Sequence, residues 1–251
     1  MDEKKYIDFL VELHRGTERQ GPGTPDATAR ALGFLPPFQP HHRILDVGCG
    51  TGASTRVLWT RTPSQLVASD FFPLFLRAVD EKRFLDKVAD RVDIVAADMS
   101  ALPFDRASFD LIWSEGAIYI MGFETGLNAW RPLLKTGGYI AVSELSFLRS
   151  RPSKRCVDHW KAAYPGMASV TSNLDAMVRA GYDVVGHFTL PKAAWTDHYY
   201  ASLKQRLPDF EKNHGTDPVA RFVLEECRTE MAMFDRFSDE YNYEFYIGKR
   251  R

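Results

Sequence analysis

Short apolar runs alternate with segments of helical spacing through the middle of this chain. Runs of strand length lie at 43–48, 65–70, 92–98, 109–115 and 139–145, and helical patterns lie at 53–61, 73–88 and 123–135. The runs are apolar along most of their length, which is typical of parallel strands covered on both faces. The alternation therefore predicts an α/β fold with a doubly wound sheet.

The flanking segments are more helical. Apolar residues at helical spacing predict a helix over 2–15, and Thr24 followed by Pro25 marks the start of a second. Later helices are expected at 153–164, 170–180, 193–213 and 217–240, with strands at 182–190 and 243–249. Since no long linker interrupts the chain, we expect a single domain. It would comprise a helical extension (1–40), a core (41–148), and an insertion with the last strands (149–251).

Composition narrows the class of protein. The chain is 45% hydrophobic and 26% charged, with a net charge of −1, so nothing favours capture of nucleic acid or of an anionic membrane. We expect no secretory signal, no stable membrane insertion and a cytoplasmic location. The three scattered cysteines predict neither disulfides nor a metal site. A homodimer is compatible with the sequence.

The strongest local signal is the stretch LDVGCGTGAS at 45–54. Gly48, Gly50 and Gly52, with Cys49 between the first two, connect a strand to a helix and allow a ligand to approach the main chain. The spacing fits a dinucleotide loop, but Asp46 favours a loop for S-adenosylmethionine. Its carboxylate suits the cofactor's ammonium group and is not needed beside a phosphate, which is itself negative. A turn without a ligand is the remaining alternative.

The ends of the next two strands carry further acids. Asp70 is placed to accept both hydroxyls of a ribose, or else to cap the following helix. Phe71 could cover one face of an adenine. Asp98 is placed to accept from the adenine amino group, and Met99 to supply apolar contact.

These motifs together resemble a known family. LDVGCGTG, the acid at 70, AADMSALPF and FDLIWSEGAIY occur in the order and spacing of class I S-adenosylmethionine-dependent methyltransferases, over roughly 43–148. Stretches such as RQGPGTP and LPKAAWTDHYY extend the resemblance to small-molecule methyltransferases similar to the ubiquinone/menaquinone C-methyltransferases. Residues 150–240 depart from the quinone enzymes, which puts a quinone substrate in doubt.

The resemblance implies a Rossmann-like sheet of seven strands in the order 3-2-1-4-5-7-6, with strand seven antiparallel. Strand six would be 182–190 and strand seven 243–249. It also implies S-adenosylmethionine as cofactor, S-adenosylhomocysteine as product and a small molecule as methyl acceptor.

Glu115 is the best-placed acid on the substrate side. It ends the fourth strand, where it could act as a base or anchor a substrate amine or hydroxyl. Alternatively, it stabilises its own loop, or shapes the cofactor pocket through Ser114. Tyr119 lies nearby, whereas strand periodicity puts Trp113 in the core.

The stretch AWTDHYY at 194–200 is a second candidate for the substrate side. His198 could act as a base, and Trp195, Tyr199 and Tyr200 could wall an aromatic or cationic substrate. An ordinary aromatic core beneath a helical insertion is the alternative.

The N-terminal extension contributes two further candidates. Gly21, in the loop before the second helix, could lie close to the methionine end of the cofactor, or the loop could simply join two helices. Tyr6 could help close the substrate pocket, with core packing as the alternative.

Three functions remain open on the sequence. The first is methyl transfer from S-adenosylmethionine to a small molecule. The second is an NAD(P)-dependent oxidoreductase, which Asp46 and the acid–methionine pair at 98–99 disfavour. The third is a module that binds the cofactor without catalysis, because methyl transfer requires no fixed catalytic residue that could be checked.

Overall fold

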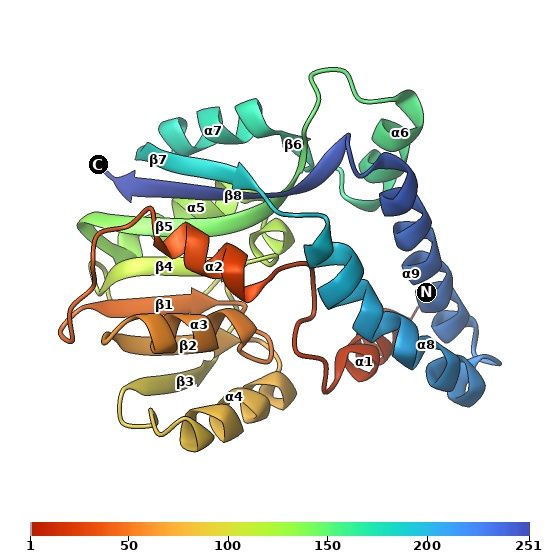
Figure 1. The fold of residues 1–251 in the computed structure, drawn as a ribbon, viewed down its shortest axis with the longest axis horizontal. Coiled ribbons are helices and arrows are strands. Elements are labelled where there is room, and N and C mark those ends of the chain that lie inside the picture. The colour runs from red at the N-terminus through yellow and green to blue at the C-terminus, as the bar shows by residue number, and fades with distance from the viewer. Residues whose placement is uncertain (1) are drawn as a thin grey trace.

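A single mixed sheet forms the centre of the protein (Figure 1). A computed structural model describes residues 2–251. The strands are β1 (Arg43–Val47), β2 (Gln65–Asp70), β3 (Val92–Ala96), β4 (Phe109–Glu115), β5 (Leu134–Phe147), β6 (Ala168–Ser169), β7 (Tyr182–Thr189) and β8 (Tyr241–Arg250). Their order is β3-β2-β1-β4-β5-β8-β7, and β8 runs antiparallel to β5 and β7. The predicted order is confirmed, with the short β6 added beside β5.

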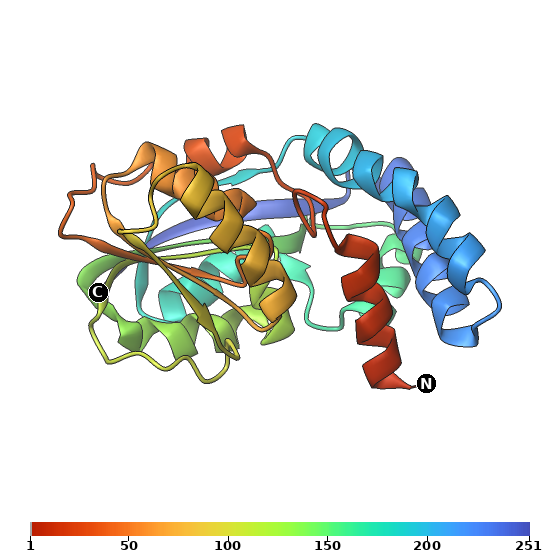
Figure 2. The same cartoon turned by 90° about the horizontal axis from the view of Figure 1, so that it is seen from below.

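Helices cover both faces of this sheet. They are α1 (Glu3–His14), α2 (Pro25–Leu32), α3 (Ala53–Arg61), α4 (Pro73–Leu85), α5 (Phe123–Trp130), α6 (Lys154–Ala163), α7 (Val170–Arg179), α8 (Ala201–His214) and α9 (Pro218–Phe237). One buried cluster joins the sheet to α2, α3 and α4, and a second joins it to α5 and α7 (Figure 2). Two apolar faces explain why the central strands are apolar throughout.

Two predicted elements differ in detail from the observed ones. The helix expected over 123–135 ends at Trp130, and a 3₁₀ turn at Arg131–Leu133 leads directly into β5. Pro132 has no N–H for a helical hydrogen bond, and Leu134 is buried as a strand residue. The helix expected over 193–213 begins as a π-helix, Ala194–Tyr200, that continues into α8.

The helices α1, α6, α8 and α9 lie beyond the carboxyl ends of the parallel strands (Figure 1). Contacts between distant parts of the chain hold α1 in this group: Lys5 pairs with Asp217, and Tyr6 Oη donates to Glu226 Oε2 at 2.8 Å. The carboxyl edge of the sheet is therefore covered by the two ends of the chain. Across residues 2–251, none of the helices combines the length and apolarity needed to cross a bilayer.

Candidate functional site

The loop between β1 and α3 has a backbone that glycine adopts most readily. Gly48, Gly50 and Gly52 have φ angles of +68°, +54° and +84°, in the left-handed region where a Cβ causes strain. A Cβ on Gly48 would lie 2.5 Å from the Cβ of Ala117, just after β4. Cys49 is buried in the same loop, and burial raises the pKa of its thiol. The loop thus lies against the exit of β4 with no room for a side chain at Gly48.

Asp46 is fully buried one residue before the end of β1. Its Oδ2 accepts from Ser54 Oγ at 2.9 Å and from Thr55 Oγ1 at 2.7 Å, in the first turn of α3. Burial raises the pKa of this carboxyl to about 7. Among residues 2–251, no side chain or main-chain group bonds Oδ1. Since a buried carboxylate oxygen needs a donor, Asp46 both secures the loop and leaves one acceptor unused.

Two hydroxyl groups near Asp46 are also unused. Ser69 in β2 and Ser114 in β4 lie on the strands that flank β1, and the Oγ of each is buried without a partner in the described part of the chain. In the register of the sheet, Ser69 lies opposite Val47 and Ser114 follows the partner of Asp46, so both hydroxyls lie on the other face of the sheet from the Asp46 carboxylate.

Asp70, at the end of β2, is tied to the glycine loop. Its Oδ2 accepts from the main-chain N–H of Gly50 at 2.9 Å, and its Oδ1 from that of Phe72 at 2.9 Å. Burial raises the pKa of Asp70. The helix after it is capped at Phe72 without a side-chain hydrogen bond, so Asp70 is not its N-cap. Phe71 is 63% exposed beside this carboxylate, as a ring that covers a ligand would be.

Asp98 and Met99 follow β3 with different surroundings. Asp98 is exposed, and its Oδ1 accepts from the N–H and the hydroxyl of Ser100, which lowers its pKa. The carbonyl of Met99 accepts from Trp130 Nε1 at 2.9 Å. The Cε of Met99 is 3.5 Å from where a Cβ on Gly48 would lie. Met99 therefore borders the glycine loop.

Residues 15–24, between α1 and α2, pass over the glycine loop, and we call them the covering segment. Thr51 Oγ1 donates to the carbonyl of Glu18 at 2.8 Å, and Thr51 N donates to Gln20 Oε1 at 3.0 Å. A Cβ on Gly50 would lie 2.1 Å from Gln20 Oε1. Gly21 follows in the same segment, and no heavy atom lies within 4 Å of where its Cβ would be. The segment is thus bonded to the loop, with open space at Gly21.

Glu115 is held by three donors. Its Oε2 accepts from Arg19 Nη1 at 2.8 Å. Its Oε1 accepts from Thr28 Oγ1 at 2.6 Å and from Trp113 Nε1 at 3.0 Å. The side chains of Arg19 and Glu115 are only 8% and 6% exposed. Because its charge and lone pairs are engaged inside the protein, this geometry favours a loop-stabilising acid over a free base.

Sequence reasoning missed Arg19, Gln20 and Thr51. Each is an ordinary polar residue in a loop, and nothing local marks its partner. The stretch RQGPG at 19–23 did suggest, through Gly21, a loop near the methionine end of the cofactor, but it did not show what Arg19 and Gln20 would bond. The carboxylate of Glu115 did stand out, yet two of its three partners come from residues 87 and 96 positions away.

The predicted site residues of the π-helix separate into buried and exposed ones. Trp195 is 1% exposed, stacks on Phe234 with a centroid distance of 4.5 Å, and donates to Asn242 Oδ1 at 2.7 Å. It is a core residue, and its expected place in a substrate wall is corrected. His198 is exposed on the outer side of the same turn, because helical geometry turns Trp195 and Tyr200 inwards.

Tyr199, Tyr119 and Tyr6 all lie on the carboxyl side of the sheet. Tyr199 Oη is 3.3 Å from His14 Nε2 of α1. Tyr119, 41% exposed, packs edge-on against Tyr164 with a centroid distance of 5.8 Å. Tyr6 is half-buried and bonded to α9. These three therefore remain candidates for contact with a substrate.

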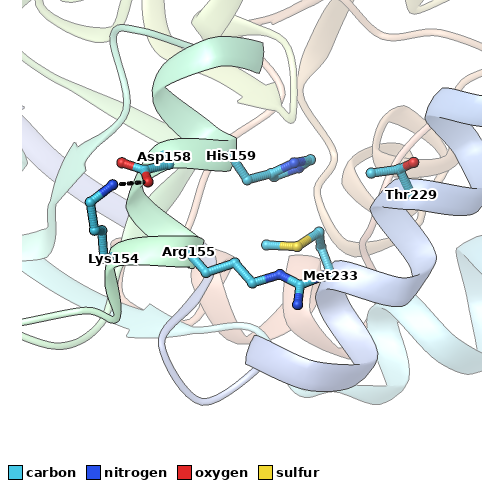
Figure 3. A pocket seen from close by; sticks show the side chains of 6 residues that line it. All are labelled: Lys154, Arg155, Asp158, His159, Thr229 and Met233. Carbon is cyan, nitrogen blue, oxygen red and sulfur yellow. Dashed lines mark hydrogen bonds and ion pairs between the residues drawn. The ribbon is translucent and has the colours of Figure 1, made fainter.

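An open groove lies between α6 and α9, away from the predicted site residues (Figure 3). Lys154 and Asp158 pair on its rim, and His159 faces Thr229 and Met233 across it. None of the residues of the glycine loop lines this groove. The candidate site is thus defined by the loop and strand ends described above.

Comparison with known proteins shows which family the core of the chain resembles. Residues 45–142 match the family model described as a methyltransferase domain. The chain is 33% identical over 143 residues to the malonyl-[acyl-carrier protein] O-methyltransferase of Dechloromonas aromatica, covering 54% of this chain and 51% of that protein. It is 35% identical over 133 residues to the demethylmenaquinone methyltransferase of Clavibacter sepedonicus, covering 52% and 53%. The chain thus spans about half the length of these two relatives.

Similarity to solved structures extends over the whole chain. A methyltransferase from Geobacter sulfurreducens, solved with S-adenosyl-L-homocysteine, superposes with a TM-score of 0.82 over 97% of this chain and 98% of that one, at 21% identity. This likeness is one of fold. Residues 45–142 are therefore similar to a methyltransferase domain, and the chain has the Rossmann-like fold and strand order that the sequence predicted.

Proposed function

We propose that this protein transfers a methyl group from S-adenosylmethionine to a small-molecule acceptor. The observation that carries the proposal is the glycine loop between the carboxylates of Asp46 and Asp70, inside a matched methyltransferase domain. The relatives named above are methyltransferases, which supports the same reaction.

The residues present fit this cofactor. The unpartnered Oδ1 of Asp46 suits the ammonium group of its methionine end. Asp70 lies where ribose hydroxyls could donate to its carboxylate, and the exposed ring of Phe71 is free to cover an adenine. Asp98 and Met99 would border the adenine from the end of β3.

S-adenosylmethionine, when bound, supplies a methyl group already activated on a sulfonium. The chain must then hold the acceptor in line and keep water out. The covering segment contributes by lying over the glycine loop through Gln20 and Thr51. Glu115, neutralised by Arg19, holds that segment against β4. We assign Glu115 this positioning role, and His198 none in the reaction.

Calorimetry tests the cofactor. We expect S-adenosylmethionine and S-adenosylhomocysteine to bind and NADH not to bind. Binding of NADH alone would replace the proposal with an oxidoreductase. A screen of metabolites, read out by release of S-adenosylhomocysteine, then separates an enzyme from a module that only binds the cofactor, because the module would give no turnover.

Asp70→Asn tests the binding geometry. The amide keeps one acceptor but loses the charge that ribose hydroxyls would use, so affinity for S-adenosylhomocysteine should fall at least about tenfold. Asp93→Asn is the matched control, since Asp93 is an exposed acid on the neighbouring strand β3. Equal affinity in wild type and Asp70→Asn would remove Asp70 from the cofactor site.

We further propose that residues 1–40, 41–148 and 149–251 form one domain, because α1 is bonded to α8 and α9 across the carboxyl side of the sheet. Limited proteolysis should then give no stable fragment. A cytoplasmic location and a homodimer remain predictions, to be tested by cell fractionation and by light scattering of the purified protein.

A further inference from the structure

A group of tyrosine and glutamate side chains gathers on the substrate side of the sheet. We call it the tyrosine–glutamate cluster, and its members are Tyr119, Tyr164, Tyr199, Tyr243, Glu144 and Glu230. They come from the turn after β4, the end of α6, the π-helix, β8, β5 and α9. Six separate elements thus converge there, and none of the roles assigned above uses the two glutamates.

Glu144 is the least satisfied side chain of the cluster. It is 1% exposed, and both carboxyl oxygens are buried without a hydrogen-bond partner among residues 2–251. Burial raises its pKa to about 8. Leaving both oxygens of a buried carboxyl unpaired is costly. The Tyr164 hydroxyl, which also has no partner, could supply one donor, and the second oxygen still calls for another.

Glu230, in α9, is the second carboxyl near these tyrosines. Burial raises its pKa to about 7. Burial is the main cause of the raised pKa of Tyr119 and of Tyr243. The charges of Glu144 and Glu230 raise both pKa values further. Both carboxyls are therefore close enough to Tyr119 and Tyr243 to raise the pKa of each phenol.

Part of the cluster is open to solvent. Tyr119 keeps 41% of its surface accessible, although burial is the main cause of the raised pKa of its phenol. Glu230 and Tyr199 also keep part of their surface accessible while burial raises their pKa values. These three side chains can therefore be reached from solvent, and we call the opening beside them the recess.

This recess adjoins the glycine loop. A Cβ on Gly116 would lie 3.7 Å from Tyr243 Oη, and the neighbouring Ala117 borders Gly48. Residues 116–117 thus separate the loop from the cluster by the thickness of a single chain. A molecule in the recess would lie within reach of a methyl donor bound at the loop.

No cation balances these carboxyls. Within residues 2–251, neither Glu144 nor Glu230 forms an ion pair. His14 stacks on Tyr199, but burial lowers its pKa, so it is neutral at pH 7. The nearby guanidinium of Arg206 donates to the carbonyls of Leu13 and Glu12 instead. An anionic acceptor would find no cation here to pair with.

Aromatic faces combined with carboxyls are the chemistry that recognises an ammonium group. Tyrosine rings attract a cation through their electron-rich faces, most strongly when the cation is desolvated. A buried carboxyl without a partner is satisfied by an N–H donor or a positive charge. We propose that the tyrosine–glutamate cluster receives a cationic ammonium group of the methyl acceptor; this inference rests on the proposed methyl transfer.

Binding to protein saturated with S-adenosylhomocysteine tests the proposal. The probes are choline with its neutral isostere 3,3-dimethylbutan-1-ol, and a panel of primary arylalkylamines, each with its N-acetyl derivative. By calorimetry, we expect at least one cation to bind, and to bind at least about tenfold more tightly than its neutral partner. Equal binding of the partners, or no binding by any cation in the panel, would overturn the inference.

The same titration distinguishes the two proposals. If S-adenosylhomocysteine itself fails to bind, the proposed function fails, and this inference with it. If it binds normally and no cation does, only the acceptor class is wrong.

Variants locate the binding site. Glu144→Gln and Glu230→Gln remove the negative charge with little change of shape, so the cation that binds wild type should bind each at least about tenfold more weakly. Affinity for S-adenosylhomocysteine should stay within about twofold, which also shows that the variants are folded. Asp110→Asn is the control, because Asp110 is a partly buried carboxylate already bonded to Lys135, near the start of β4 and away from the cluster. Unchanged cation binding in the double Gln variant would contradict the assignment.

Discussion

Arg19 and Glu115 form a buried ion pair, with 2.8 Å between Nη1 and Oε2, across 96 positions of the sequence. The pair joins the covering segment to the end of β4. Glu115 therefore stands at the substrate side of the sheet, as its position at the end of a strand predicted, but its carboxylate is engaged within the protein. Its role in holding the covering segment can be measured separately from any role in chemistry.

Arg19→Ala should destabilise the protein by about 3–5 kcal/mol, because it leaves a buried carboxylate without its cation. Removing both charges in Arg19→Met with Glu115→Gln should recover much of that loss, since the amide oxygen of the new side chain could still accept from Thr28 and Trp113. Urea denaturation measures both. A double variant no more stable than Arg19→Ala would show that the pairing does not account for the loss.

Glu115→Gln separates positioning from catalysis. If Glu115 holds the covering segment, the variant should both bind S-adenosylhomocysteine more weakly and be less stable than wild type. Loss of a base would instead lower kcat while leaving that affinity intact. Glu124→Gln, at an exposed ion pair on α5, serves as the control and should change neither.

Gly48→Ala should abolish most cofactor binding. The new Cβ would lie 2.5 Å from that of Ala117, at a φ of +68° that alone costs about 1–2 kcal/mol. Gly137→Ala is the matched control, because Gly137 has a φ of +74° but its nearest atom is the flexible Lys249 Cε at 3.6 Å. Calorimetry with S-adenosylhomocysteine should show at least a tenfold loss for Gly48→Ala only. Equal losses of affinity in the two variants would mean that backbone strain, and not the contact with Ala117, explains the effect at Gly48.

Stability of the ligand-free protein should fall as pH rises from about 5 to 8. Burial raises the pKa of Glu144 to about 8 and that of Glu230 to about 7. Between the unfolded and folded pKa values, the folded state binds more protons than the unfolded state, so raising the pH favours unfolding. Glu144→Gln should be more stable than wild type at pH 8.5, and the difference should shrink towards pH 5. Urea denaturation at the two pH values checks this, and parallel pH profiles would refute it.

His198→Ala should leave turnover within about twofold of wild type, because the imidazole is exposed on the outside of the π-helix. Trp195→Phe should instead cost stability, about 1–3 kcal/mol, by losing buried surface and the bond to Asn242. Thermal unfolding and steady-state kinetics measure the two. A large loss of kcat in His198→Ala would return this residue to the site.

The core of the fold followed from local patterns in the sequence. Strand and helix periods, the Thr24–Pro25 helix start, and the glycines after β1 are properties of a few neighbouring residues, so they could be predicted without tertiary contacts. The strand order at the C-terminal side came from the resemblance, and the structure confirmed it. Asp46 and Asp70 could be selected because each lies at or near the end of a strand beside the loop.

The tertiary structure decided what those patterns left open. Arg19 became the partner of Glu115, and Gln20 that of Thr51, only because residues far apart in sequence met at the carboxyl edge of the sheet. Trp195 and His198 belong to one short aromatic stretch, and only helix packing assigned the first to the core and the second to the surface. Glu144 looked like an ordinary polar residue within a strand; its lack of partners could be known only once the surrounding elements had closed over it. The sequence by itself therefore determined the sheet and its cofactor loop, since both depend on short-range spacing. The charges and contacts on the substrate side depend on which distant side chains share a space.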